Sequence, residues 1–375
     1  MTAVLVPLGT RPEIIKLAPV VRELSATGVD VRLLATGQHG DAAMSAAFFD
    51  ELNMHPDETW VLPADPQARV AAILEGAERE LAANRPDLVL VLGDTNTVPL
   101  FCLAARRNRV PVAHLEAGLR SFNATSMEEV NRKVAAACAS LHLAPTDLAA
   151  SFLAEEGIDP AHVRVVGNPV IDVLRQLGVR RVDPGERAGA VLTAHRATNV
   201  DDPARLRALV ELVHRIADEA GTVTFPVHPR TRRRLEEAGL LGALAGTGVV
   251  LSEPVGYRAM SELVAASRLV VTDSGGLQEE ASFFGVPVVV LRRSTPRWEG
   301  VRAGTSRLVG MDVALAMAAV RELVSPQSQQ LADSTPCPYG DGHTAERVAT
   351  LLGEPATWDL LRLEEPDFVG REPPA

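Results

Sequence analysis

The feature that most constrains the fold is an alternation of short apolar runs with amphipathic segments along almost the whole chain. In the amphipathic segment 12–26, Leu17, Val20 and Leu24 recur at the spacing of one helix face. The apolar runs that we expect to form strands are residues 3–9, 29–36, 87–92, 110–115, 141–144, 163–167, 190–194, 222–227, 248–252, 268–272 and 287–291. Strands and helices that alternate in this way are typical of parallel sheets covered by helices on both faces.

The length of the chain predicts two such domains. A chain of 375 residues is long for one hydrophobic core and suits two domains of ordinary size. We expect a Rossmann-like N-terminal domain in residues 1–169 and a Rossmann-like C-terminal domain in residues 170–351. Residues 352–375 should form a helix and a tail, rich in Pro and Glu and frayed at its end, that pack back on the N-terminal domain. Two doubly wound domains are expected to leave a cleft between their sheets, and ligands of such folds bind beyond the carboxyl ends of the strands.

Composition excludes several classes of protein. A net charge of −11 argues against nucleic acid as a partner, and no apolar run reaches the length of a membrane span. The chain opens on the strand-like AVLVPLG without a basic leader. Cys102, Cys138 and Cys337 are odd in number and lack metal-binding spacing, which indicates a reducing compartment. We therefore expect a cytoplasmic protein with no metal or other cofactor, no nucleic-acid partner and no membrane partner.

One strand-to-helix turn has the character of a phosphate site. Residues 270–291 read VVTDSGGLQEEASFFGVPVVVL, and Gly275 and Gly276 let backbone N–H groups approach an anion at the start of a helix. Glu279 and Glu280, one turn later, would repel phosphate but could accept hydrogen bonds from a neutral diol such as a ribose. An ordinary βα turn with helix-capping residues explains the same segment about as well.

Cations follow the first expected strand. Arg11 and Lys16 begin the next helix, where they could hold phosphate, although a solvated helix start explains them too. Lys16 is one of only two lysines, against 35 arginines.

Carboxylates follow three further elements of the first half. Asp94 comes after the strand 87–92, Glu116 ends the strand 110–115, and Glu128 opens a helix. Each could instead have a purely structural role: Asp94 as a helix N-cap, Glu116 as a carboxylate in a structural ion pair, and Glu128 as an acid that stabilises a helix start.

In the second half, two histidines and an arginine follow strands. His195 follows the strand 190–194, and His228 follows the strand 222–227. A lone histidine is more often structural than catalytic, but two at matching strand ends improve the case for function. Arg297 and Glu299 follow the last predicted strand. Because no His/Cys/Asp group has metal spacing, a phosphate site would rely on the cations and on His195.

In the order and spacing of its motifs, the chain resembles the non-hydrolysing UDP-N-acetylglucosamine 2-epimerases over residues 3–352. The motifs are GTRPEIIKLAPV, TGQH, GDTNT, HLEAGLRS, EEVNR, GNPVID, TAHR, HP, EPVGY, TDSGGLQEEA, GVPVVVLR and YGDG. The resemblance implies a GT-B-like fold of two Rossmann-like domains facing a cleft, and a homodimer. It also implies reversible conversion of UDP-N-acetylglucosamine to UDP-N-acetylmannosamine.

The chemistry of that family explains the carboxylates. The hydrogen on C2 of the sugar is not adjacent to a carbonyl, so the family eliminates UDP to give 2-acetamidoglucal and then adds it back. This route needs a base, an acid and a tightly held leaving group. By position, the family's catalytic residues fall on Asp94, Glu116, Glu128 and His195, and the motifs leave open which carboxylate removes the proton. The residues that match the phosphate and nucleotide contacts are Arg11, Lys16, His195, Ser274, Gly275, Gly276, Glu280 and Arg297.

The chain departs from the family pattern at three motif positions. Met127 and Trp298 stand where the family usually has proline, and both motifs keep their charged residues. Thr198 stands where it usually has glutamate, which removes a charge near the phosphates and puts turnover or substrate range in question.

A second, activating substrate site is expected to be absent. Many bacterial members bind UDP-N-acetylglucosamine there through Gln and Arg, at positions where this chain has Asp41 and Ala72, although Gln38 remains.

Three other functions share these features. A GT-B glycosyltransferase would have the same fold and nucleotide site but usually needs a single base and an acceptor. A hydrolysing epimerase would release free N-acetylmannosamine, and a nucleotide-sugar sensor would bind without turnover. Incubation with UDP-N-acetylglucosamine alone separates these hypotheses, and the motifs leave open the pathway that the product enters.

Overall fold

The computed structural model describes residues 2–37, 49, 52 and 54–364. Gln38, Asp41 and the predicted tail from residue 365 onward lie outside the described residues. Contacts divide the chain into two compact units: the first is Met1–Gly118, Ala124–Val166 and Ala345–Ala375, and the second is Leu119–Asn123 and Gly167–Thr344. Apart from the short segment Leu119–Asn123, the chain changes unit at 166/167 and 344/345, whereas the domain limits at 169/170 and 351/352 remain a prediction.

The first unit is built on a seven-stranded parallel sheet in the order β3-β2-β1-β4-β5-β6-β7. Its strands are β1 (Ala3–Leu8), β2 (Asp30–Ala35), β3 (Glu58–Thr59), β4 (Leu88–Leu92), β5 (Val112–Leu115), β6 (Leu141–Ala144) and β7 (Val163–Val165). The strand order reverses between β1 and β4, and in doubly wound sheets the ligand lies at such a reversal.

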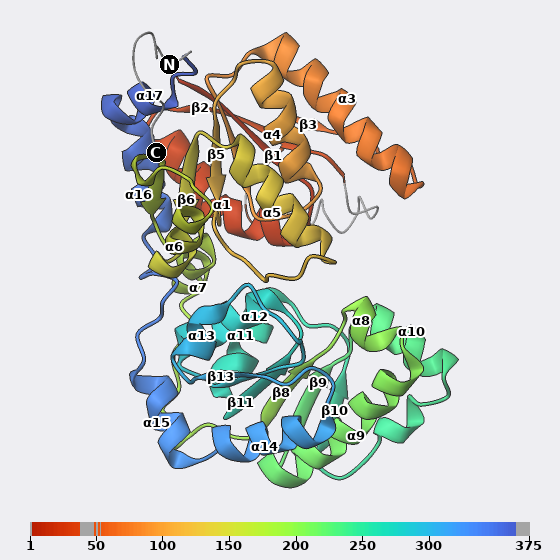
Figure 1. Cartoon of the computed structure of the whole chain (residues 1–375). Coiled ribbons are helices and arrows are strands. Elements are labelled where there is room, and N and C mark those ends of the chain that lie inside the picture. The colour runs from red at the N-terminus through yellow and green to blue at the C-terminus, as the bar shows by residue number, and fades with distance from the viewer. Residues whose placement is uncertain (1, 38–48, 50–51, 53, 365–375) are drawn as a thin grey trace. The chain divides into compact units, whose positions relative to one another are not determined.

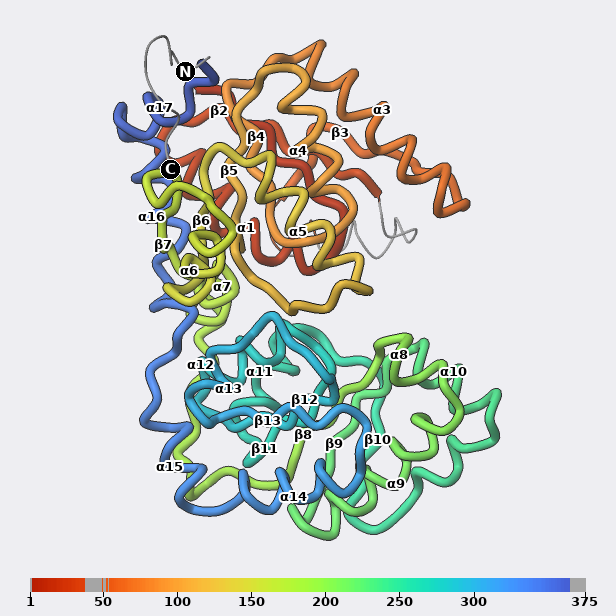
Figure 2. Tube along the Cα trace, in the orientation of Figure 1, coloured from red at the N-terminus to blue at the C-terminus, as the bar shows by residue number. Residues whose placement is uncertain are grey.

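Helices cover both faces of this sheet (Figure 1). They are α1 (Arg11–Ala26), α3 (Pro66–Asn84), α4 (Thr97–Arg107), α5 (Met127–Cys138), α6 (Asp147–Glu155), α16 (Thr344–Gly353) and α17 (Pro355–Leu361). Because strand side chains alternate, Val4 and Val6 pack with Leu17 of α1 and Val348 of α16, while Leu5 packs on the other face with α3 and α4. The chain thus returns to the first unit at its C-terminal end, as the blue part of the trace shows in Figure 2.

The second unit repeats the design with a six-stranded parallel sheet in the order β10-β9-β8-β11-β12-β13. The strands are β8 (Ala190–Thr193), β9 (Val223–Pro226), β10 (Val249–Ser252), β11 (Leu269–Thr272), β12 (Val288–Val290) and β13 (Ser306–Leu308). Here the order reverses between β8 and β11, which pair from Leu269 opposite Ala190 to Thr272 opposite Thr193.

The helices of the second unit are α7 (Pro169–Leu177), α8 (Ala197–Val200), α9 (Pro203–Ala220), α10 (Pro229–Glu237), α11 (Tyr257–Ala266), α12 (Gly275–Phe284), α13 (Trp298–Arg302), α14 (Val313–Leu323) and α15 (Pro326–Ser334). Leu269 and Val271 of β11 belong to a core with α9 and α14, whereas Val270 belongs to a core with α7, α11 and α12. Both faces of the sheet are therefore buried, as the continuous apolar runs predict.

The predicted class, α/β with two parallel sheets, is confirmed. The predictions missed the two edge strands β3 and β13 because each is only two or three residues long and contains polar residues. Within the described residues, no helix combines the length and the apolar character needed to cross a membrane.

Candidate functional site

In the first unit, a lysine and a glutamate from two strand ends form a buried ion pair. Lys16 lies on α1, just after β1, and its Nζ donates to Oε1 of Glu116, which follows β5. Both side chains are buried. Glu116 has a left-handed backbone with φ 62°, one of four such non-glycine residues in the described part of the chain. Strain of this kind is tolerated where the surroundings hold a residue in a special position, and it often marks function.

Two glycines with left-handed backbone lie beside Glu116. Gly93, at the end of β4, has φ +78°, and a Cβ there would lie 3.6 Å from Oε2 of Glu116. Gly118 has φ +82°, and a Cβ there would come within 2.1 Å of the carbonyl oxygen of Ala149. Any larger residue at Gly118 would therefore displace the turn that carries Glu116.

Asp94 is held by α5. Arg132 Nη2 donates to Oδ2 of Asp94, and Asn131 Nδ2 donates to its main-chain oxygen at 2.9 Å. The alternative role of Asp94 as a helix cap is wrong, because the N-cap of α4 is Asn96. Asp94 is instead the partner of a buried arginine.

The two glutamates that open α5 differ in environment. Glu129 is buried, and its Oε2 lies 3.6 Å from Nη1 of Arg132. Glu128 is half-buried and accepts a hydrogen bond from the hydroxyl of Ser126. The helix that fixes Asp94 thus also carries Glu128 in its first turn.

Glu13 is a buried carboxylate to which the sequence assigned no role. Its Oε2 accepts from Gly9 N–H at 3.0 Å, and its Oε1 accepts from the Thr95 hydroxyl at 2.9 Å. It therefore joins the turns that follow β1 and β4. Burial raises the pKa of Glu13 to about 7, although hydrogen bonds from Thr10, Thr95 and Gly9 act to lower it.

In the second unit, Asp273 connects the ends of β8 and β11. It is fully buried and accepts the main-chain N–H groups of His195, at 3.0 Å, and Arg196, at 2.9 Å. Asn199 Nδ2 donates to the same carboxylate at 3.0 Å, and Nδ1 of His195 lies 3.0 Å from Oδ1.

His228 lies beside His195 but has a different bonding pattern. The two ring centroids are 5.4 Å apart. His228 is the N-cap of α10, and its Nδ1 accepts from the N–H of Arg230 at 3.2 Å. Burial, and then the neighbouring His195, lower the pKa of His228.

The glycine turn forms the start of α12, with Ser274 as its N-cap. A Cβ on Gly275 would lie 3.1 Å from Nη1 of Arg297, so the guanidinium lies directly against this glycine. Arg297 donates through Nε at 2.8 Å and Nη2 at 2.7 Å to Oε1 of the fully buried Glu279. Asn168 Nδ2 donates to the same oxygen at 3.1 Å.

These contacts separate the two glutamates of α12. The predicted diol-binding role is not supported for Glu279, which is the ion-pair partner of Arg297. Glu280 is buried one residue later, near the Tyr257 hydroxyl. The pKa of Tyr257 is raised by burial and then by the charge of Glu280.

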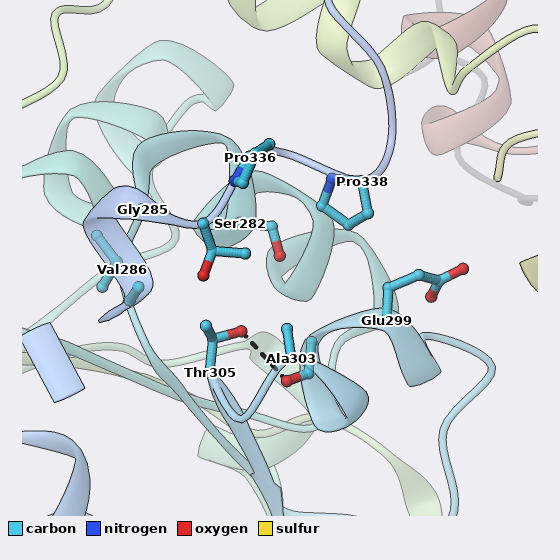
Figure 3. Close-up of a pocket in the computed structure, with 11 residues that line it drawn as sticks. Ser282, Gly285, Val286, Glu299, Ala303, Thr305, Pro336 and Pro338 are labelled. Atoms are coloured by element: carbon cyan, nitrogen blue, oxygen red, sulfur yellow. Dashed lines mark hydrogen bonds between the residues drawn. The ribbon is translucent and has the colours of Figure 1, made fainter. Parts of the chain in front are cut away.

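A small cavity of about 50 Å³ lies beside α13 (Figure 3). Its lining includes Ser282, Glu299, Thr305 and Pro336 but none of the residues assigned to substrate. The hydroxyl of Thr305 donates to the carbonyl of Gly300, another lining residue, at 3.2 Å. The volume suits a few water molecules among these hydroxyl groups.

Comparison with known proteins decides the family. A family model described as UDP-N-acetylglucosamine 2-epimerase matches residues 22–353. The chain belongs to the UDP-N-acetylglucosamine 2-epimerase family. A Methanocaldococcus jannaschii protein named UDP-N-acetylglucosamine 2-epimerase is 37% identical over 363 residues, covering 92% of this chain and 97% of the relative. A Pseudomonas aeruginosa UDP-2,3-diacetamido-2,3-dideoxy-D-glucuronate 2-epimerase is 35% identical over 364 residues, covering 94% and 99%.

Solved structures of epimerases agree with this assignment. The M. jannaschii enzyme in complex with UDP-GlcNAc and UDP has a TM-score of 0.84 at 36% identity, covering 94% of this chain and 99% of that chain. The Neisseria meningitidis epimerase bound to UDP-GlcNAc has a TM-score of 0.82 at 30% identity, covering 94% and 100%. This chain is thus an enzyme, an isomerase, and the predicted GT-B-like α/β class is confirmed.

The structure places the predicted epimerase residues in two groups. In the first unit, Lys16 contacts Glu116, while Arg11 is exposed at the start of α1. In the second unit, Ser274, Gly275, Gly276, Glu280 and Arg297 gather at the start of α12, and His195 follows the neighbouring β8. No group of three His, Cys, Asp or Glu side chains able to hold a metal occurs among the described residues.

Three acidic residues hold these groups in place: Glu13 and Asp273, which the sequence did not assign, and Glu279, to which it assigned a different role. All three lie within the motifs that resemble the family, and this location is the only sequence signal that could have pointed to them. Their partners come from other strand ends, so their contacts appear only in the folded chain.

The departures from the family pattern also have places in the structure. Thr198 is exposed on α8, and its main-chain oxygen accepts from Arg205 at 2.6 Å. Trp298 donates through Nε1 to the Arg120 carbonyl at 2.9 Å, and its ring lies 6.3 Å from that of Phe122. Trp298 therefore holds the segment Leu119–Asn123, which belongs to the second unit.

We predict that Glu13 makes the epimerase less stable as the pH rises. The folded chain keeps the proton up to about pH 7, whereas an ordinary glutamate at 4.5 has already released it in the unfolded chain. Its contribution is fully present below about pH 4.5 and is lost as the pH passes 7, a change on the order of 3 kcal/mol. Urea unfolding at about pH 5 and about pH 8 measures this slope.

Glu13→Gln is the matched variant for this prediction. Its amide oxygen keeps an acceptor for Gly9 N–H, and the amide stays uncharged at both pH values, as the protonated carboxyl is. The variant should lose the part of the slope that Glu13 causes. An equal slope in both proteins would show that Glu13 titrates normally.

Proposed function

We propose that this epimerase interconverts UDP-N-acetylglucosamine and UDP-N-acetylmannosamine by elimination and re-addition of UDP. The observation that carries the proposal is the strained, buried Glu116, paired with Lys16 next to the turn that bears Asp94. Removal of the C2 proton needs an ionised carboxylate close to the sugar, and a cation beside a carboxylate favours its ionised form. Both Asp94 and Glu116 have such a cation.

In the proposed reaction, a carboxylate removes the hydrogen on C2 as a proton, a C1–C2 double bond forms, and the C1–O bond to UDP breaks. The products of this half-reaction are 2-acetamidoglucal and UDP. The UDP oxygen then adds back to C1, and an acid delivers a proton to the opposite face of C2. The groups proposed for these proton transfers are Asp94, Glu116 and Glu128.

The second unit is proposed to hold UDP. The N–H groups at the start of α12 and the guanidinium of Arg297 suit the diphosphate, and Glu280 suits the ribose. His195 and the cations Arg11 and Lys16 are proposed to contact the same leaving group.

The deciding experiment is incubation with UDP-N-acetylglucosamine alone in D₂O, in the presence of a chelator, followed by proton NMR. We expect UDP-N-acetylmannosamine that carries deuterium at C2, because the proton that returns comes from solvent. Product that retains the original hydrogen would overturn the elimination route. Free N-acetylmannosamine with UDP would indicate a hydrolysing enzyme, and no reaction without an acceptor would favour a glycosyltransferase.

The substrate itself is tested in the same assay. The P. aeruginosa relative is named for a diacetamido-glucuronate, so this nucleotide sugar belongs in the panel. Faster turnover of that compound would move the proposed substrate from UDP-N-acetylglucosamine to the glucuronate.

We also propose that the enzyme is a homodimer that uses one face of α4 and α5. Met127, Val130 and Val134 of α5 and Leu103 of α4 are exposed, with relative exposures of 38–61%. On α5 they recur at three- and four-residue steps and so share a face, and exposed apolar patches often mark interfaces.

The expected result is a sedimentation mass twice the chain mass of 39.9 kDa. Val134→Glu should shift the protein toward the monomer, because a carboxylate would be buried in the interface. Val70→Glu on α3 is the control, since Val70 is similarly exposed but lies on another helix. A wild-type monomer, or an equal effect of both variants, would contradict this interface.

A further inference from the structure

Two imidazoles lie side by side at the ends of β8 and β9, and their hydrogen bonds distinguish them. His195 and His228 have ring centroids 5.4 Å apart. Two neighbouring imidazoles do not both carry a positive charge readily, since like charges oppose ionisation. The contacts of each ring indicate which one takes the charge.

The carboxylate of Asp273 is an ionised acceptor. Burial opposes its ionisation, but hydrogen bonds from the His195 side chain and from the main-chain N–H groups of His195 and Arg196 outweigh burial and lower the pKa of Asp273. An ionised carboxylate only accepts hydrogen bonds. The ring nitrogen that faces it, Nδ1 of His195 at 3.0 Å, therefore carries a proton.

The position of this pair follows from the sheet. Thr272 of β11 is paired with Thr193 of β8, so the residues that follow the two strands are neighbours. Asp273 also accepts from Asn199 Nδ2, and its main-chain oxygen accepts from Arg196 Nε at 3.1 Å. With Nδ1 turned to Asp273, Nε2 is left as the outer nitrogen of a side chain that is 40% exposed.

His228 has the opposite arrangement. Its Nδ1 accepts from Arg230 N–H and so is unprotonated, which places the proton of a neutral ring on Nε2. The charged groups around it are His195, Asp273 and Arg230, and burial is the largest cause that lowers the pKa of His228. Unlike His195, His228 uses Nδ1 as the acceptor that caps a helix.

We propose that Asp273 is a positioning residue that makes His195, rather than His228, the cationic imidazole of the diphosphate site. The inference rests on the proposed function. Asp273 keeps a proton on Nδ1 and offsets the charge of the imidazolium, and Nε2–H donates to the diphosphate as the C1–O bond breaks. In the re-addition, Nε2–H keeps its hydrogen bond to the attacking diphosphate.

The first test is NMR of the full chain with ¹⁵N-labelled histidine, with and without UDP. Ring ¹⁵N shifts report which nitrogen carries a proton and whether the ring is charged. We expect Nδ1–H at His195 in the free protein, an imidazolium at His195 with UDP, and a neutral Nε2–H ring at His228 in both. A charged His228 with UDP bound, or a His195 whose Nδ1 carries no proton, would overturn the proposal from the wild-type spectra alone.

The second test is Asp273→Asn. The asparagine oxygen can still accept a main-chain N–H, whereas its NH₂ group would face Nδ1 and favour the Nε2–H form of His195. We expect turnover to fall by about 10²- to 10⁴-fold, the scale for a functional imidazole that loses its carboxylate and takes the wrong tautomer. UDP affinity should fall in parallel, while thermal unfolding checks that the variant is folded.

The matched control is His228→Asn, which removes the neighbouring imidazole but keeps an N-cap for α10. It should leave the His195 ring pattern unchanged and cost less turnover than Asp273→Asn. Loss of turnover in Asp273→Asn with an unchanged His195 pattern would show that Asp273 only shapes the loop, and would overturn the proposal. A wild type with the expected ring patterns but no epimerisation would instead contradict the proposed function.

Discussion

Asp94→Asn, Glu116→Gln and Glu128→Gln are each expected to lower turnover by about 10²-fold or more, the effect of losing a general acid or base. UDP binding should largely persist, because most of the proposed nucleotide contacts, those of α12, Arg297 and His195, belong to the second unit. Steady-state kinetics and calorimetry with UDP measure the two effects separately.

Glu129→Gln is the matched control for Glu128→Gln. Glu129 follows Glu128 in the first turn of α5 but is buried against Arg132. Its substitution should therefore lower stability more than turnover. Near-normal turnover in Glu116→Gln would show that Glu116 serves only as the buried partner of Lys16.

Arg297→Ala is expected both to weaken UDP binding and to destabilise the fold by about 3–5 kcal/mol. The substitution removes the guanidinium from a fully buried Glu279, and an ion pair broken from one side leaves an uncompensated charge. Calorimetry with UDP and denaturant unfolding measure the two consequences. His195→Ala should also weaken UDP binding.

A second substitution separates the two roles of Arg297. Arg297→Ala combined with Glu279→Gln removes the buried charge, so stability should largely recover while UDP binding stays weak. Unchanged UDP affinity in both Arg297→Ala and His195→Ala would exclude these residues from the diphosphate site.

Local sequence signals were enough to predict the strands that consist of continuous, buried apolar residues. The strands β1, β4, β8 and β11 lie where continuous apolar residues stand, because such strands are covered on both faces. The edge strands β3 and β13 gave no such signal, since short polar strands are indistinguishable from loops in sequence.

The sequence by itself determined the α/β class, the two parallel sheets and the family, because these depend on local periodicity and on motif order. Only the tertiary structure decided how the charged residues pair. Lys16 meets Glu116 a hundred positions away, and Arg132 meets Asp94, because strand order brings distant strand ends to one edge of a sheet. A buried charge without a partner is costly, so each of these charges is paired. The spacing of residues along the chain does not reveal which partner it is.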